Sequence, residues 1–316
     1  MIETRWDPLT NLTSRIIHFP KKKFEKQEVD IFPRLAPPES CPFCPENIEK
    51  MTSKFEKDLF GCERVREDGV TVIPNLLTFD KYCIVAIISE KHFPDILEIV
   101  ENGYITKGIR VLVELLRRIT TRDRQVKYMS INCNYMPMSG SSVLHPHVQA
   151  IAGATGTNYH RLMVEKSKSF FRTHGKVFWE LLKECESEKM ERFVGTIGKT
   201  FWYTPYAPKG NMDIGCIFSK SSILDLDETD LCDLETGLKR VIKYFVSENI
   251  FGYNFSLFSS VPGNEKSFRV NLRILGRRFL PPVGASDTNY FHTIHLETTA
   301  VFTPEEVAEG LRKYWN

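Results

Sequence analysis

Apolar and polar residues follow two different periods along the chain, and each period predicts one kind of element. Short apolar stretches, which are typical of strands, lie at 81–89, 127–134, 146–152, 197–204, 213–218, 252–260 and 268–275. Apolar residues at helical spacing lie at 94–102, 105–121, 158–186 and 227–247. A last helix is predicted by its start signal, in which Thr303 suits the N-cap, Pro304 the first helical position and Glu306 the capping box.

The order strands–helix–strands–helix occurs twice along the chain. This order predicts an α+β fold of two related halves, residues 1–190 and 191–316, on antiparallel sheet flanked by helices rather than a parallel doubly wound sheet. Residues 1–60 are rich in Pro, Lys and Glu, so we expect mostly loop there, with a short strand-like piece at 15–19. The chain contains neither Gly-x-Gly-x-x-Gly nor a Walker loop, which argues against a standard dinucleotide or P-loop site.

The composition is that of an ordinary soluble globular protein, with 42% hydrophobic and 26% charged residues among 316. The net charge of +2 gives no general attraction to nucleic acid, and we interpret the basic run 21–23 as a solvated loop. No apolar run approaches about 18 residues, so no membrane span is expected. The N-terminus lacks the order of a signal peptide, so we expect a cytoplasmic protein whose eight cysteines stay reduced.

The segment 139–149, Ser-Gly-Ser-Ser-Val-Leu-His-Pro-His-Val-Gln, combines a small polar loop with two histidines. In an extended strand, residues two apart point to the same face, so we expect His145, His147 and Gln149 to line one surface. An imidazole can attack phosphorus or coordinate a metal, and Gly140 lets backbone N–H groups approach an anion. The segment therefore favours phosphate chemistry, with a histidine-rich strand edge as the alternative.

Cys41 and Cys44 have the spacing at which two thiolates share one tetrahedral zinc ion. A redox pair is the alternative, although a thioredoxin-type motif should begin a helix in a βαβ unit and prolines surround this one. A second Cys-x-x-Cys motif is absent from the sequence, so the other ligands would be histidines. His92, after the 81–89 strand, and His145 would complete a closed, structural site with two cysteines and two histidines.

If His145 binds a metal ion, His147 is left for chemistry. A neutral imidazole is a good nucleophile at phosphorus when one ring nitrogen is unprotonated and the other holds its proton in a hydrogen bond. Gln149, on the same face, can donate to a non-bridging oxygen as charge develops, and Ser141 and Ser142 can donate to a neighbouring phosphate. This arrangement predicts group transfer through a phospho- or nucleotidyl-histidine, without a redox cofactor.

These motifs resemble the galactose-1-phosphate uridylyltransferase branch of the histidine-triad superfamily, and the resemblance covers most of the chain. The most specific match runs from Asn134 to Gln149, where the spacing of the family's Asn, Gly, Ser and His-Pro-His-Gly-Gln block is kept without a gap over 16 residues. Shorter segments that look like family motifs are Arg5-Trp6-Asp7-Pro8-Leu9-Thr10, Cys41-Pro42-Phe43-Cys44, Pro74-Asn75 and Ser89-Glu90-Lys91-His92.

The resemblance implies two histidine-triad-like halves, usually in a homodimer. The half 1–190 would carry the zinc site and the catalytic histidine, and the half 191–316 would lie on the sugar or acceptor side. His147 would be the nucleotidylated nucleophile and Gln149 its phosphoryl partner. The implied nucleotide contacts are Asn75 for the nucleoside and Asn134, Gly140, Ser141 and Ser142 for the phosphates. The implied ligands of a structural Zn²⁺ are Cys41, Cys44, His92 and His145.

Two departures from the family pattern concern the catalytic strand and a second metal. Val148 stands where the family has Gly, and in a strand its side chain would point away from the phosphate face, so the chemistry can be retained. Some relatives carry a second metal site built partly from His-x-His before Pro-Pro. The matching stretch, 276–282, contains no histidine, so we expect no second metal.

A third departure concerns the acceptor. Thr299 stands where the family has a hexose-contacting Gln, and the family's Glu falls near Thr293. The replacement of both side chains weakens the case for galactose 1-phosphate as the acceptor. Four nearby side chains are candidates for contacting a different acceptor, and the two arginines among them would suit an anionic one. The alternative interpretation is that these side chains only pack in the core or at the surface. They are Arg277, Arg278, His292 and His295.

Three functions fit the sequence. The first is a uridylyltransferase of galactose metabolism that passes a nucleotidyl group from a nucleotide sugar, such as UDP-glucose, to a hexose 1-phosphate. The second keeps the nucleotidyl-histidine but uses inorganic phosphate, as do phosphorylases acting on ADP-glucose or a dinucleoside polyphosphate. The third is a non-catalytic nucleotide- or RNA-binding module, against which the near-neutral charge and the complete His-Pro-His-x-Gln motif argue.

Overall fold

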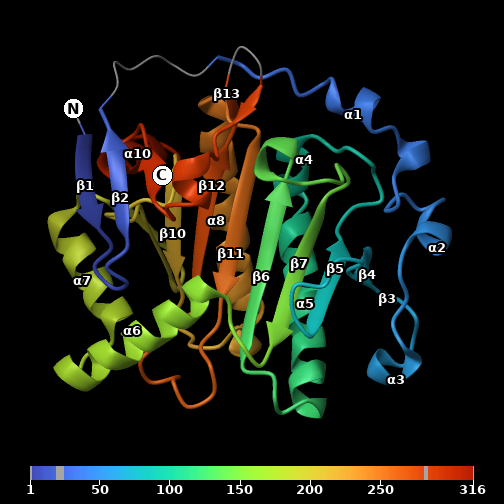
Figure 1. Ribbon diagram of the computed structural model, residues 1–316, viewed down its shortest axis with the longest axis horizontal. Helices are drawn as coiled ribbons and strands as arrows, with labels where there is room; N and C mark the ends of the chain where they lie inside the picture. Colours follow the sequence, from blue (N-terminus) through green and yellow to red (C-terminus); the bar gives the residue numbers. More distant parts are fainter. Residues whose placement is uncertain (1, 19–24, 281–283, 316) are drawn as a thin grey trace.

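A ten-stranded sheet forms the centre of the computed structural model, which describes residues 2–18, 25–280 and 284–315 (Figure 1). Its strands are β3 (Val65–Glu67), β4 (Val70–Pro74), β5 (Tyr82–Ile87), β6 (Tyr128–Tyr135), β7 (His147–Gly153), β8 (Phe193–Ile197), β9 (Thr200–Tyr203), β10 (Asp213–Ile217), β11 (Gly252–Phe258) and β12 (Asn271–Arg277). Their order across the sheet is β3-β4-β5-β7-β6-β11-β12-β10-β9-β8. Every neighbouring pair is antiparallel.

The sheet consists of two sets of five strands that have the same internal order, β3-β4-β5-β7-β6 and β8-β9-β10-β12-β11. The sets join where β6 pairs with β11 in the middle of the sheet (Figure 1). In this pairing Asn134 lies directly opposite Asn254. This arrangement confirms the predicted α+β class, with an antiparallel sheet flanked by helices. The division of the chain at 190 and 191 stays a prediction.

One face of the sheet is covered by α5 (Tyr104–Arg122) and α8 (Glu228–Ser247), one long helix behind each set of strands (Figure 1). The apolar stripe of α5 is buried from Ile105 to Ile119 and packs against Val148 and Ala150 of β7. Because residues two apart in a strand share a face, His147 and Gln149 of β7 are left on the opposite face.

The opposite face is covered by two separate apolar clusters. Helices α6 (Asn158–His174) and α7 (Phe178–Lys189) cover the second set of strands, through a cluster that includes Trp179 and Phe268. Over the first set, a smaller cluster packs Ile48 against β4 and β5. The other helices are α1 (Phe32–Leu35), α2 (Ile48–Met51), α3 (Lys57–Phe60), α4 (Ile96–Glu101), α9 (Tyr290–Thr293) and α10 (Pro304–Arg312).

Two predicted elements have different bounds in the structure. The predicted helix 158–186 is wrong as one helix, because α6 ends at His174 and is capped by Gly175, whose φ of +66° is a left-handed conformation that favours glycine. The Gly175 amide donates to the Phe171 carbonyl oxygen at 2.9 Å, and α7 starts three residues later. The predicted strand 197–204 contains β9 and only the last residue of β8, because the chain turns at Gly198 between them. The rest of β8, which pairs with β9, was not predicted.

The N-terminal 60 residues contain more strand than predicted. Strands β1 (Ile2–Trp6) and β2 (Thr13–Ile17) form an antiparallel pair, and β15 (Thr298–Ala300) joins β2 in parallel. The predicted strand 15–19 covers part of β2, while residue 19 and the basic run 21–23 lie outside the described residues. A further two-stranded ribbon is formed by β13 (Phe279–Leu280) and β14 (Ala285–Ser286).

The hairpin of β3 and β4 was not predicted, although the sequence contains its signal. Asp68 and Gly69 connect the two strands, and both have positive φ, 50° and 75°. Two-residue hairpin turns of this kind favour Asp-Gly, so the dipeptide between Val65 and Val70 is informative. The predicted start of the last helix is confirmed, because Thr303 Oγ1 accepts from the Glu306 amide at 3.2 Å.

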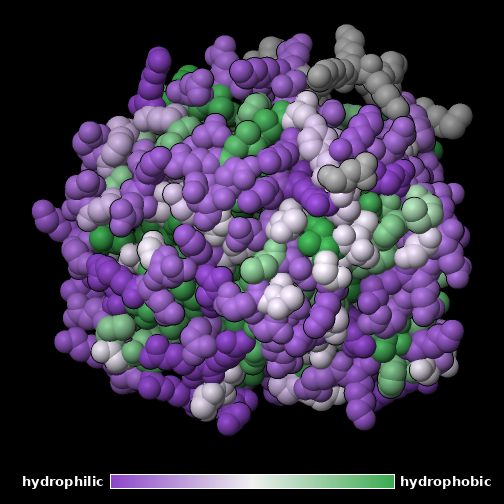
Figure 2. Space-filling view, turned by 180° about the vertical axis from the view of Figure 1, so that it is seen from behind, coloured by the Kyte–Doolittle hydropathy of each residue, from purple (hydrophilic) through white to green (hydrophobic). Residues whose placement is uncertain are grey.

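The surface and the interior divide the apolar residues as expected for a globular chain. Seen from behind, the surface is mainly hydrophilic, with apolar side chains scattered between polar ones (Figure 2). Large side chains such as Trp202, Phe218 and Phe245 are fully buried in one core that both sets of strands share. Within the described ranges, no helix is long and apolar enough to cross a membrane.

Candidate functional site

Four side chains from three segments of the chain converge beside the start of β7. One ligand atom each from Cys41, Cys44, His92 and His145 lies within 4.8 Å of all the others. The Sγ–Nδ1 distances are 3.4 Å for Cys44 and His92, 3.7 Å for Cys44 and His145, and 3.8 Å for Cys41 and His145. A tetrahedral ion with ordinary Zn–S and Zn–N bonds would place such atoms about 3.5 Å apart. The four side chains can therefore hold one metal ion.

The two histidines of this group are fixed by backbone carbonyl groups. The Nε2 atom of His92 lies 2.7 Å from the Ala36 oxygen, and that of His145 lies 2.7 Å from the Ser89 oxygen. A carbonyl oxygen can only accept, so each Nε2 carries the ring proton and each Nδ1 presents its lone pair to the sulfur atoms. Metal-binding histidines require this kind of second hydrogen bond and this division of ring nitrogens.

Burial shifts the pKa values of this group in the directions that favour its neutral forms. Burial and the neighbouring Cys41 sulfur raise the pKa of the Cys44 thiol to about 12. Burial lowers the pKa of His145 to about 4, so its ring is neutral at pH 7. A bound cation would stabilise the thiolates by replacing their protons, which couples metal binding to the release of protons.

His147 begins β7 and is 7% exposed. Its Nδ1 atom lies 2.9 Å from the His145 carbonyl oxygen, so Nδ1–H donates and Nε2 keeps its lone pair. Burial lowers the pKa of His147, which keeps the ring neutral. The Phe43 ring packs edge-on against it, with ring centres 5.2 Å apart. His147 therefore has the protonation state of a nucleophilic imidazole.

A cavity of about 400 Å³ lies over the strands that carry His147. All seven residues predicted for catalysis or nucleotide binding line this cavity, and they come from the loop after β4, from β6, from the β6–β7 connection and from β7. They are Asn75, Asn134, Gly140, Ser141, Ser142, His147 and Gln149. The structure thus brings these residues together in a space of the size that holds small ligands, and their individual roles stay predictions.

The amide of Gln149 is oriented by Asn75. The Leu77 amide donates to Asn75 Oδ1 at 3.1 Å, which fixes the Asn75 amide with its Nδ2 toward Gln149. Asn75 Nδ2 then donates to Gln149 Oε1 at 3.2 Å. Because Oε1 is occupied in this way, Gln149 has its donor Nε2 left for the cavity that it lines.

The connection between β6 and β7 supplies the polar loop of the cavity. Gly140 has a φ of +84° and ends a short 3-10 turn, and a Cβ at this position would have no atom within 4 Å. The glycine is therefore required by the backbone conformation and not by lack of space. Ser141 Oγ donates to the Val143 carbonyl oxygen at 2.7 Å and stabilises the loop, whereas Ser142 is exposed.

Val148 points away from the cavity, as expected. Its side chain is fully buried in the core between the sheet and α5, and Ile84 and Ala86 of β5 lie in the same core. His147 and Gln149 lie on the other face of the strand, where His147 is opposite Ile87 in β5. The valine therefore changes the packing behind the strand and leaves the polar face of the strand unchanged.

The mouth of the cavity carries apolar side chains that the sequence analysis did not assign. Leu76, Leu77 and Phe79 follow Asn75 in the chain, line the cavity and are 84%, 69% and 72% exposed. The signal in the sequence is a run of large apolar residues in a loop between two strands. The cavity thus has a polar floor and an apolar rim, which suits a ligand with an anionic part and a flat apolar part.

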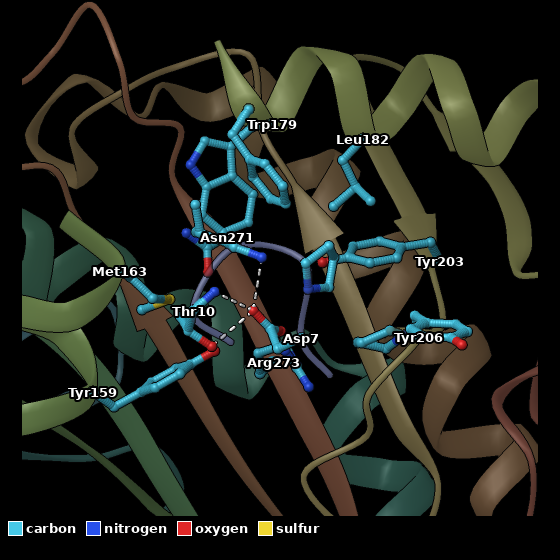
Figure 3. A pocket seen from close by; sticks show the side chains of 14 residues that line it. Asp7, Thr10, Tyr159, Met163, Trp179, Leu182, Tyr203, Tyr206, Asn271 and Arg273 are labelled. Carbon is cyan, nitrogen blue, oxygen red and sulfur yellow. Dashed lines mark hydrogen bonds between the residues drawn. The ribbon is translucent and has the colours of Figure 1, made fainter. Parts of the chain in front are cut away.

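A second cavity, of about 30 Å³, lies under α6 and α7 in the other half of the sheet (Figure 3). The N-terminal segment 5–10 ends here and not beside His147. Asp7 Oδ1 accepts from the Thr10 amide at 2.7 Å and from the Thr10 hydroxyl at 2.8 Å, which closes a tight turn. The space holds about one water molecule and is too small for a nucleotide, so the segment 5–10 has a structural role here.

The C-terminal residues considered for the acceptor lie apart from the polar floor. Thr299 lies in β15 and lines a cavity of about 60 Å³ with Arg277 and His292. The Arg277 guanidinium is already paired with Asp287, with Nε 2.9 Å and 3.0 Å from the two carboxylate oxygens. Residues 281 and 282 of the stretch without histidines lie outside the described residues.

Known structures with similar folds were found by comparison. An ADP-glucose phosphorylase from Arabidopsis thaliana with bound ADP-glucose superposes with a TM-score of 0.76, at 19% identity and 99% coverage of both chains. A GalT-like protein from Arabidopsis thaliana gives 0.74, at 19% identity and 98% coverage of both. A uridylyltransferase gives 0.68, at 19% identity, covering 99% of this chain and 98% of that one.

The chain has the fold of the galactose-1-phosphate uridylyltransferase-like proteins. An uncharacterized protein from Archaeoglobus fulgidus is 29% identical over 317 residues, which cover all of this chain and 93% of that protein. No model of a protein family matches the chain. The similarity to the solved structures therefore supports the expected fold, and the site residues provide the basis for a function.

Proposed function

We propose that this protein is a nucleotidyltransferase that acts on a nucleoside-diphosphate sugar through a covalent nucleotidyl-His147. The observation that carries the proposal is the protonation state of His147, whose Nδ1–H is held by the His145 carbonyl while Nε2 keeps a lone pair beside the cavity. Gln149, with its donor end left for the cavity, would stabilise charge on the attacked phosphate. The shared fold is consistent with this chemistry.

The reaction takes place in two displacements. In the first, His147 Nε2 attacks the α-phosphorus, an N–P bond forms, and the bond from this phosphorus to the bridging oxygen breaks, so that the sugar 1-phosphate leaves. In the second, a phosphate oxygen of the acceptor attacks the same phosphorus and the N–P bond breaks. His147 then regains its lone pair, and Nδ1 keeps its proton throughout.

The acceptor that we propose first is a hexose 1-phosphate, with UDP-glucose as the donor, so that the protein acts as a uridylyltransferase of galactose metabolism. The second candidate is a phosphorylase, in which inorganic phosphate attacks the nucleotidyl-histidine. It is favoured by Thr299, which stands where the family resemblance places a hexose-contacting Gln and which lies in a cavity of only about 60 Å³. In both reactions the first displacement is the same.

We propose that the metal bound by the four-ligand group is Zn²⁺ and that its role is structural. Two thiolates and two imidazoles are the donor set that zinc prefers, and four protein ligands leave no open position for substrate. The site would anchor the segment 41–44 to His145, whose carbonyl group orients His147. We also propose a homodimer, to be tested by light scattering on the purified protein.

The proposal is tested by incubating the protein with α-³²P-labelled UDP-glucose or ADP-glucose without an acceptor. We expect acid-labile, base-stable label on the protein, together with release of glucose 1-phosphate. His147→Ala should abolish the label, whereas His174→Ala, at an exposed histidine of α6, should leave it unchanged. Label that persists in folded His147→Ala protein would exclude His147 as the nucleophile.

The acceptor is identified by adding galactose 1-phosphate, glucose 1-phosphate or inorganic phosphate to the isolated labelled protein. Transfer of label to a hexose 1-phosphate supports the uridylyltransferase, and formation of a nucleoside diphosphate from inorganic phosphate supports the phosphorylase. Nucleotide binding without any label would instead support a non-catalytic module.

A further inference from the structure

A chain of hydrogen bonds crosses from the second set of strands to the nucleotide cavity. It begins at the Asp287 carboxylate, which holds the Arg277 guanidinium, and Thr288 Oγ1 accepts from Arg277 Nη2 at 2.7 Å. Arg277 Nη1 donates to Asn254 Oδ1 at 2.6 Å. Asn254 lies directly opposite Asn134 in the pairing of β11 with β6, so the chain ends at a residue that lines the cavity.

The two ends of the Asn254 amide are distinguished by their neighbours. On one side Arg277 has only donors, so the atom that faces it must be Oδ1. On the other side the Ser139 carbonyl oxygen only accepts, so the atom 2.9 Å from it must be Nδ2. The opposite assignment would place two donors together and two acceptors together, so Asn254 can adopt one orientation only.

The same logic then fixes Asn134. Asn254 Nδ2 lies 2.6 Å from the Asn134 side chain, and the Asn134 atom that faces this donor must be Oδ1. The donor Nδ2 of Asn134 is thereby left for the cavity. Gln149 is set in the same sense by Asn75, so two amides are oriented to donate on the floor that His147 lines.

We propose that Arg277 and Asn254 are positioning residues that orient the Asn134 amide so that it donates to a phosphate of the bound nucleotide. The inference rests on the proposed function, because it needs a nucleotide phosphate in this cavity. Its consequence is that the second set of strands determines how the first set recognises an anion.

The test compares the affinity of the full-length protein for a nucleoside monophosphate with its affinity for the corresponding nucleoside, both measured by calorimetry. Ligands with adenine and with uracil as the base are used. Asn254→Leu removes both hydrogen-bonding ends without adding charge. We expect it to weaken binding of the monophosphate by about tenfold, since a hydrogen bond to a charged group is lost, and to leave nucleoside binding unchanged. Equal weakening of both ligands, or of neither, would overturn the inference.

A double-mutant cycle separates orientation from general stability. Asn134→Ala removes the donor itself, so Asn254→Leu should have no further effect on monophosphate affinity in that background, whereas independent effects would add. Asn254→Asp should weaken monophosphate binding more than Asn254→Leu does. The aspartate carboxylate only accepts, so Asn134 would turn its Nδ2 toward residue 254 and its Oδ1 toward the cavity. Asn211→Asp is the matched charge control, since Asn211 Oδ1 accepts from the Val301 amide at 2.8 Å and aspartate keeps that bond.

The outcomes distinguish this inference from the proposed function. Wild-type protein that binds no nucleotide, or never forms a nucleotidyl-histidine, counts against the proposed function. Wild-type protein that binds the monophosphate more tightly than the nucleoside, with Asn254→Leu indistinguishable from it, counts against the positioning role alone. Arg277→Lys keeps the charge but loses the planar donor geometry, and we expect it to reproduce part of the Asn254→Leu effect.

Discussion

Val148 in β7 packs against Gly108 in α5, and the valine fits because residue 108 has no side chain. A Cβ on Gly108 would lie 2.8 Å from Val148 Cγ2 and still closer to Ile88 Cγ2, so the helix approaches the sheet at this point. The family pattern has glycine where this chain has Val148. Here the larger side chain is placed behind β7, against a glycine on the helix that covers it.

Gly108→Ala should therefore destabilise the protein, although Gly→Ala inside a helix ordinarily stabilises it by about 0.5–1 kcal/mol. Overpacking of this kind costs about 1–3 kcal/mol, because Ile88 and Val148 must move. The measurement is urea unfolding of the variant. Gly210→Ala is the control, since its nearest neighbour would be 3.8 Å away and we expect little change. Unchanged or increased stability of Gly108→Ala would show that α5 and β7 separate without cost.

Removal of the metal should lower the free energy of unfolding by several kcal/mol. A metal ion held by four protein ligands contributes its binding energy to folding, and in the proposed site it would tie the segment 41–44 to His92 and His145. Chelation and Cys41→Ser should both lower the melting temperature, with zinc content measured by mass spectrometry. Cys185→Ser, at an exposed cysteine, should change neither quantity. Purified protein that folds stably without zinc would contradict the four-ligand assignment.

Asn75→Asp should slow formation of the nucleotidyl-histidine by about a hundredfold. An aspartate at this position still accepts from the Leu77 amide. It presents an acceptor oxygen to Gln149, however, where Asn75 Nδ2 now donates to Gln149 Oε1. Gln149 would turn its Nε2 toward the carboxylate and present Oε1 to the phosphate. Rapid-quench labelling measures the rate. Gln149→Ala should show a similar loss, and the double variant should lose little more than either one, whereas additive losses would argue against this orientation.

The sequence reveals the polar floor of the main cavity, because one short segment, 139–149, holds His147, Gln149 and the polar loop. Periodicity also predicts α5 and the strands that surround it. It does not reveal Asn254, which is 120 residues from Asn134 and meets it only through the pairing of β6 with β11. The break at Gly175 was missed because α6 and α7 pack on the same strands, so their apolar patterns continue across it.

His160 should make the stability of the protein depend on pH between about 6.5 and 4. It is 2% exposed, its Nε2 lies 2.6 Å from the Ser259 carbonyl oxygen, and aromatic rings of Tyr128 and Phe258 pack against it. Burial lowers its pKa to about 4 in the folded protein, against about 6.5 in the unfolded chain.

The sign of the dependence follows from proton counting. Between these two pKa values the unfolded chain binds more protons, so the free energy of unfolding falls as the pH is lowered from about 6.5, and the loss levels off below about 4 at roughly 3 kcal/mol. Urea unfolding at several pH values should show a flatter slope for His160→Gln than for the wild type, even if the variant is less stable at pH 7. His174→Ala, at an exposed histidine, should keep the wild-type slope. Release of a bound metal in acid would affect the wild type and both variants alike. A slope in His160→Gln equal to that of the wild type would therefore show that His160 accepts a proton in the folded protein without loss of stability.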